Sequence, residues 1–114
     1  METLLILLFL LIVGHCLCDY PLQGDFIGKF KNPSNPNPFP SGSHPWLVLM
    51  SAHCFIHAGA VYLITGIIWF ALAELLLHFI IDVCKNNNKI SFNMDQWLHI
   101  FCKACYVVVI GFVS

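Results

Sequence analysis

Four pairs of histidine and aspartate side chains lie four residues apart in this chain, and all four fall within apolar stretches. The pairs are His15/Asp19, His53/His57, His78/Asp82 and Asp95/His99. A spacing of four places both side chains on one face of an α-helix. The ten His and Asp residues of the chain would form only roughly 0.8 such pairs if scattered at random. Polar groups are costly inside apolar helices, so the pairs indicate a site between helices, with metal binding as the leading hypothesis.

The eight side chains are five imidazoles and three carboxylates. A zinc ion takes four protein ligands in a structural site, or three and a water molecule in a catalytic site. Eight groups therefore suit two ions, or one ion whose histidine ligands are oriented by aspartates. Mixed nitrogen and oxygen ligands favour zinc, with iron or manganese as alternatives, over calcium or magnesium. Glu74, one turn before His78, is expected to act as a general base, to orient a ligand or to relay protons, without binding the metal itself.

The composition predicts an integral membrane protein. Of the 114 residues, 59% are hydrophobic and 10% are charged, whereas a soluble domain usually has about 25% charged residues. The length predicts a single domain over residues 1–114. The chain has no arginine and a formal net charge of -1, which argues against nucleic-acid binding. The pattern Cys102-Lys-Ala-Cys105 lacks the second pair or the fold of a zinc or redox motif, so we interpret the six cysteines as small buried residues.

The apolar segments predict an all-α bundle of four transmembrane helices that alternate up and down. The helices are expected at about residues 3–23, 46–64, 67–85 and 94–113, with Gly66 as the break between the middle two. The first segment lacks a basic residue and a convincing cleavage site, so we interpret it as a retained helix rather than a signal peptide. Residues 24–45 carry prolines at positions 33, 36, 38 and 40, which predicts a loop with polyproline character.

In such a bundle the four pairs lie at the same membrane face. Four lysines flank the loops at this face, Lys29, Lys31, Lys85 and Lys89, so the positive-inside rule predicts that it is cytoplasmic. Lys103 lies inside the last helix, where it is expected to reach the membrane interface or to line the site. Gln23 is expected to hydrogen-bond near the first pair, and His44 to be an ordinary surface residue. The tryptophans fall near helix ends, as is typical of aromatic belts: Trp46, Trp69 and Trp97.

The order of these residues is similar to that of a known family. The chain reads His15-x3-Asp19-Tyr-x-Leu-Gln23, then His53-x3-His57, His78-Phe-Ile-Ile-Asp82-x2-Lys85 and Asp95-Gln96-x2-His99. Over about residues 11–110 it resembles small bacterial and phage membrane proteins catalogued as domain of unknown function 3307. The resemblance implies four helices in a bacterial inner membrane and these polar positions, but no substrate. The Pro/Asn-rich loop and the cysteines depart from the family pattern without touching the motif.

The leading hypothesis for function is a metal-dependent hydrolase of a lipid or another amphipathic ester, amide or phosphate. A metal-bound hydroxide would be its nucleophile, and a distant likeness to membrane metallohydrolases supports it by analogy only. Three alternatives stay open. Transport of a metal ion or proton would need an oligomer, because four short helices make a narrow pore. A non-catalytic interaction protein, for example a phage factor acting on a host membrane complex, would use the pairs only for helix packing. A di-iron oxygenase fits loosely, since such bundles use Glu-x-x-His and more carboxylates.

Overall fold

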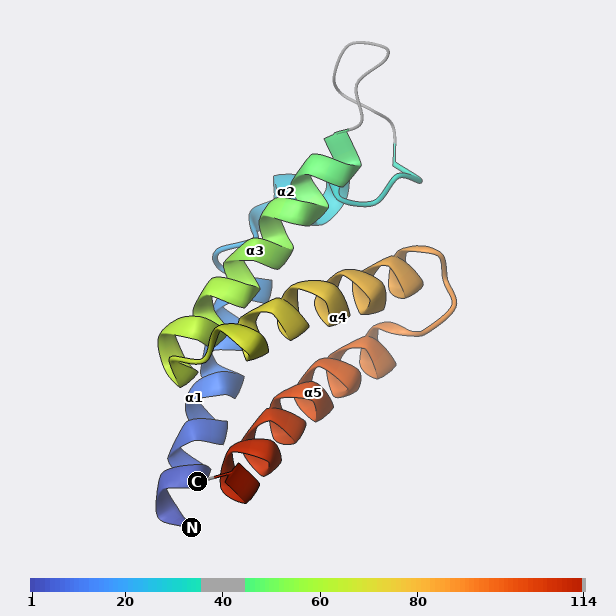
Figure 1. Ribbon diagram of the computed structural model, residues 1–114. Helices are drawn as coiled ribbons and strands as arrows, with labels where there is room; N and C mark the ends of the chain where they lie inside the picture. The colour runs from blue at the N-terminus through green and yellow to red at the C-terminus, as the bar shows by residue number, and fades with distance from the viewer. Residues whose placement is uncertain (36–44, 114) are drawn as a thin grey trace.

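The computed structural model describes residues 1–35 and 45–113, and in these ranges the regular structure is all α-helix. Five helices follow one another along the described chain: α1 (Glu2–Asp19), α2 (Gly24–Phe30), α3 (Pro45–Thr65), α4 (Ile68–Asn86) and α5 (Phe92–Val113) (Figure 1). The expected bounds of the last three long helices are met to within two residues. The prolines at 36, 38 and 40 and His44 lie outside the described residues.

The N-terminal part of the chain differs from expectation in two ways. Helix α1 ends at Asp19 instead of residue 23, because Pro21 disfavours helical geometry in the residue before it, and Tyr20 has φ -111 and ψ -81. The expected loop over residues 24–45 is wrong in its first part, since residues 24–30 form the short helix α2. Gly24 has φ 69, which redirects the chain into this helix.

The break between α3 and α4 falls at Gly66, as the sequence predicts. Gly66 has φ 69, in the left-handed region that favours glycine, and its N–H donates to the carbonyl of Tyr62 at 2.7 Å. Ile67 is then extended, with φ -115 and ψ 111, and α4 begins at Ile68. This tight turn makes α3 and α4 an antiparallel hairpin, and theirs is the most extensive helix contact in the described chain.

The four long helices form a ring. Helix α1 packs on α3 and α5, and α4 packs on the same two helices, while α2 packs on α3. Figure 1 shows the chain passing through the long helices in alternating directions, with both termini at one end of the molecule. Towards that end, the buried core consists of Leu11, Val61, Tyr106 and Val107. The four His/Asp pairs lie on the other side of this core, because they occur later in α1 and earlier in α3 and α5.

The long helices carry large apolar side chains on the outside and bury most of their charged ones. Among the described helices, α1, α3 and α5 are long and apolar enough to cross a membrane. Helix α4 has similar length but carries Glu74, Asp82 and Lys85. Large apolar side chains stand on the outer surface, for example Leu63 at 85% exposure and Phe112 at 87%. This distribution suits a lipid environment, in which apolar surface carries no cost.

We expect Gly66→Ala to lower the free energy of unfolding by about 1–2 kcal/mol, because alanine would have to adopt the left-handed conformation. A Cβ at Gly66 meets no other atom within 4 Å, so the loss reports the backbone alone. Titration with SDS in mixed micelles measures it. The control is Gly59→Ala inside α3, where a Cβ is equally free of contacts, and where alanine should stabilise by up to about 1 kcal/mol. Equal stability of the two variants would contradict the prediction.

Candidate metal centre

All eight side chains of the four pairs meet in one cluster between α1, α3, α4 and α5, and none is more than 8% exposed. Within the pairs, the spacing of four brings the polar groups together as expected. His15 Nε2 lies 3.3 Å from Asp19 Oδ2, and His99 Nε2 lies 3.4 Å from Asp95 Oδ1. The structure thus gathers every residue that the sequence suggests as a ligand. Their role as ligands stays a prediction.

One group within the cluster has the composition and spacing to hold a metal ion. It consists of Asp19, His53, His57 and His78, whose ligand atoms all lie within 4.8 Å of one another. Asp19 Oδ1 is 2.8 Å from His57 Nε2, 3.2 Å from His53 Nε2 and 3.8 Å from His78 Nε2. The Nε2 atoms of His53 and His78 are 3.1 Å apart. Four tetrahedral ligands at about 2.0–2.1 Å from an ion are separated by about 3.3–3.4 Å, which these four distances bracket.

Two further groups lie next to the first one, and one of them shares His78 with it. Asp82, Asp95 and His99 form one, and His15, His78 and His99 form the other. Asp82 connects them, because its Oδ1 lies 3.1 Å from His99 Nε2, whereas its Oδ2 lies 3.4 Å from His53 Nε2. The cluster is therefore a continuous set of ligand-capable atoms rather than two separate sites.

Lys31 is a member of the cluster that the pair spacing does not reveal. It follows α2 directly, is buried, and its Nζ donates to Asp82 Oδ2 at 2.7 Å. Its own carbonyl oxygen accepts a hydrogen bond from the Asn86 side chain at 3.3 Å. The sequence suggests for Lys31 only a place among the lysines that flank the loops. No periodicity could have signalled this contact, since 51 positions separate the two partners.

Gln96 joins the two halves of the cluster. Its Nε2 donates to Asp19 Oδ2 at 3.0 Å and to Asp95 Oδ2 at 2.9 Å. Its Oε1 accepts from the Tyr20 hydroxyl at 3.1 Å and lies 3.1 Å from His15 Nε2. Desolvation and the nearby Asp19 carboxylate raise the pKa of Tyr20, so this phenol stays a donor. Gln96 is part of the sequence motif Asp95-Gln96-x2-His99, but the spacing of the pairs predicts no contact for it.

Gln23 does not make the expected contact through its side-chain oxygen. This atom is buried and has no hydrogen-bond partner among the described residues. The end of α1 at Asp19 explains the difference, because Gln23 is no longer one turn further along the same helical face.

Glu74 lies at the inner end of the cluster, and both of its carboxylate oxygens have partners. Its Oε1 is 3.2 Å from His78 Nδ1 and accepts an ion-paired hydrogen bond from Lys103, while its Oε2 accepts from the Tyr106 hydroxyl at 2.9 Å. A proton on His78 Nδ1 leaves Nε2 free as a ligand, and carboxylates commonly orient metal-binding histidines in this way. Of the roles suggested for Glu74, the geometry favours the orienting one. Lys103 is buried beside it and lines the cluster, which is one of the two positions expected for it.

The charges of the cluster are compatible with a bound cation. Four carboxylates, those of Asp19, Glu74, Asp82 and Asp95, meet three ammonium groups: Lys31, Lys103 and Lys85, whose Nζ lies 3.9 Å from Asp95 Oδ2. With neutral imidazoles one negative charge remains, and an uncompensated charge in apolar surroundings is costly. Three buried ring or carboxylate atoms also lack a hydrogen-bond partner within the described chain: His15 Nδ1, His53 Nδ1 and Asp95 Oδ1.

The cysteines only partly meet expectation. Cys18 and Cys54 are buried, but Cys84 and Cys102 are half-buried and Cys16 and Cys105 are exposed. The exposed ones lie on outward faces of apolar helices, where the size and polarity of a thiol cost little. All six are free, so Cys102 and Cys105 form no disulfide.

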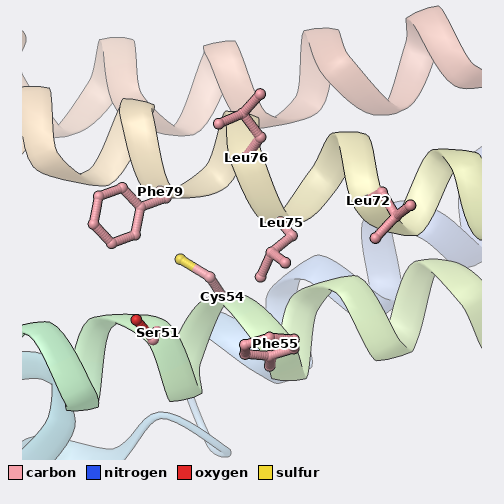
Figure 2. A pocket seen from close by; sticks show the side chains of 7 residues that line it. All are labelled: Ser51, Cys54, Phe55, Leu72, Leu75, Leu76 and Phe79. Atoms are coloured by element: carbon pink, nitrogen blue, oxygen red, sulfur yellow. The ribbon is translucent and has the colours of Figure 1, made fainter.

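An apolar groove of about 270 Å³ lies between α3 and α4, outside the cluster. Figure 2 shows Cys54 pointing towards α4 between Leu75 and Phe79; the other lining residues are Ser51, Phe55, Leu72 and Leu76. None of the eight pair residues lines it. The groove is therefore part of the surface that faces apolar surroundings, not the mouth of the candidate centre.

A family model described as protein of unknown function (DUF3307) matches residues 7–113, so the chain belongs to this family. The match spans all four pairs and confirms the resemblance seen in their order and spacing. No curated protein and no solved structure matches the chain.

We expect Lys103→Met to lower the free energy of unfolding by about 3–5 kcal/mol, because it leaves the Glu74 carboxylate buried without its cation. The double variant Glu74→Gln/Lys103→Met should recover part of this loss. Unfolding in SDS micelles measures both.

Lys85→Met is the matched control for this prediction. The Lys85 side chain is 25% exposed and its partner is 3.9 Å away, so its loss should cost no more than about 1 kcal/mol. If Lys103→Met is no more destabilising than Lys85→Met, the inner ion pair does not have the assigned role.

Proposed function

We propose that this chain is a membrane metallohydrolase: a bundle of four spanning helices that binds a divalent ion, preferentially zinc, and cleaves a lipid or another amphipathic ester, amide or phosphate. The observation that carries the proposal is the group of three imidazoles and one carboxylate with near-tetrahedral separations, Asp19, His53, His57 and His78. Nitrogen-rich ligand sets of this kind suit zinc, with iron and manganese as weaker candidates.

The fourth membrane span in this proposal is α4. Its charged residues Glu74 and Asp82 are buried within the bundle. Its outer face presents Leu72, Leu76 and Ile80, each of them exposed. Lipid would therefore contact an apolar surface on α4 as on its neighbours, and charges inside a membrane bundle are expected to face its interior in this way.

Hydrolysis fits the cluster better than transport does. Within the described part of the chain, the polar groups continue from Glu74 towards the core only to Lys103 and Tyr106, and Tyr106 packs in the apolar core with Leu11 and Val107. This core separates the cluster from the end of the molecule that holds the termini. A transported ion would have to cross the core, whereas a substrate needs access from one face only.

The end of the cluster nearest to exposed polar side chains is the one near the ends of α1 and α4 and the start of α5. Tyr20 is half exposed there, and Lys85 is partly exposed beside Asp95. We place this end on the cytoplasmic side of a bacterial inner membrane. Lys31 and Lys85 bind carboxylates, so the exposed Lys29 and Lys89 supply the free positive charge for this orientation.

The residues around the site have distinct parts in the proposed reaction. A bound zinc ion would polarise the substrate and acidify a water molecule. Glu74 holds the tautomer of His78, and Gln96 fixes Asp19 and Asp95 relative to one another. Asp95 Oδ1, buried and without a hydrogen-bond partner among the described residues, is the carboxylate oxygen best placed to accept a proton.

Metal analysis of the purified protein in detergent tests the binding site. We expect at least about one zinc per chain in the wild type, as a set of four ligands requires, and a large loss in Asp19→Asn and in His53→Ala/His57→Ala. Asp25→Asn is the matched control, because Asp25 is an exposed carboxylate in α2. A folded wild-type protein without metal, or an equal effect of Asp19→Asn and Asp25→Asn, would refute the proposed site.

Release of product from phospholipid vesicles tests the reaction. Activity should disappear with a chelator, return with zinc, and fall by roughly 10²-fold or more in Asp95→Asn if this carboxylate transfers the proton. If zinc-loaded protein cleaves no lipid ester, amide or phosphate, the proposed hydrolase activity is refuted, whereas the proposed metal site is not.

A further inference from the structure

The number of ions that the cluster can hold follows from how its groups overlap. The group His15, His78 and His99 shares His78 with the four-ligand group and His99 with the group around Asp82. It therefore cannot be filled independently of the other two. Only Asp19/His53/His57/His78 and Asp82/Asp95/His99 remain as separate candidates, and the first alone offers a complete set of four ligands.

The second group, Asp82/Asp95/His99, could hold a cation, but an ammonium group already lies beside it. Its Asp95 Oδ1 is fully buried and has no hydrogen-bond partner among the described residues, although the ring of His99 in the same group lies 3.4 Å away. Yet its other carboxylate, Asp82, is bound by Lys31 Nζ at 2.7 Å. A divalent ion on Asp82 would lie close to this ammonium group and would be repelled by it in apolar surroundings.

The overall charge of the cluster also favours one divalent ion over two. With neutral imidazoles the cluster carries one net negative charge, so one divalent ion leaves a single positive charge. One anionic oxygen from solvent or substrate balances that charge. A second divalent ion would leave three positive charges, enclosed by helices whose outer faces are apolar.

We propose that the cluster binds a single divalent ion, at Asp19, His53, His57 and His78, and that the ammonium group of Lys31 takes the place of a second ion beside Asp82. This inference rests on the metal site of the proposed function and specifies its stoichiometry. The segment that follows α2 thus completes the site by supplying a fixed cation. Asn86 contributes by binding the carbonyl of Lys31, which holds the backbone at this point.

The test compares zinc content at saturation for four forms of the full chain in detergent: wild type, Lys31→Met, Lys31→Arg and Lys29→Met. Each form is first stripped with a chelator, then titrated with Zn²⁺ alone by calorimetry, with elemental analysis of the product. We expect one ion per chain in the wild type and in Lys31→Arg, which keeps the charge. Lys31→Met should show a second binding step. Lys29→Met is the matched control, since Lys29 lies two residues earlier and is exposed.

Two ions in the wild type, or one ion in a folded Lys31→Met protein, would overturn the inference while leaving the metal site itself intact. No ion in the wild type would overturn both together. Amine labelling of the wild type supplies a test that needs no substitution. Lys31 should stay protected at saturating zinc while Lys29 reacts, and labelling of Lys31 upon zinc saturation would show that a second ion displaces it.

Discussion

The arrangement of the helices depends on the need to pair charged groups that are enclosed by apolar surfaces. A buried ion without a partner costs several kcal/mol, and lipid offers it no substitute for water. Each pairing here also connects two parts of the chain: Lys103 joins α5 to Glu74 of α4, and Lys31 joins the end of α2 to Asp82. Asp19 joins α1 to His57 of α3 at 2.8 Å. Since apolar side chains gain little from one another in lipid, these contacts supply much of the specificity that fixes the bundle.

The long helices and the convergence of the pairs could be predicted because both are local properties of the sequence. The length of an apolar stretch limits how many helices it can form, and Gly66 adopts the positive φ that breaks the stretch between Pro45 and Cys84. A spacing of four fixes which face of a helix carries two polar groups. Alternating helix directions then place the pairs at one depth without any knowledge of tertiary contacts.

The remaining parts of the cluster could not be predicted, because they depend on contacts between distant residues. Lys31 lies before a proline- and asparagine-rich segment, and nothing in its neighbours indicates a buried ion pair 51 positions away. Helix α2 exists because Pro21 ends α1 early and Gly24 redirects the chain. From the sequence alone, these residues predict a loop. Lys103 and Tyr106, which bind the Glu74 carboxylate, come from α5, so this pairing could not be predicted, whereas the contact of Glu74 with His78 follows from their spacing of four within α4.

The one-sided position of the polar cluster limits what can reach it. At its rim Tyr20 is exposed and Gln96 is half-buried, whereas its inner end at Tyr106 adjoins the apolar core. A water-soluble substrate would gain nothing from the exposed apolar surfaces beside the rim. A molecule with a polar head and an apolar tail would instead remain in the lipid while its head enters the cluster. The single positive charge left by one bound ion would then favour a head that brings a negative oxygen, as a phosphate or an ester undergoing hydrolysis does.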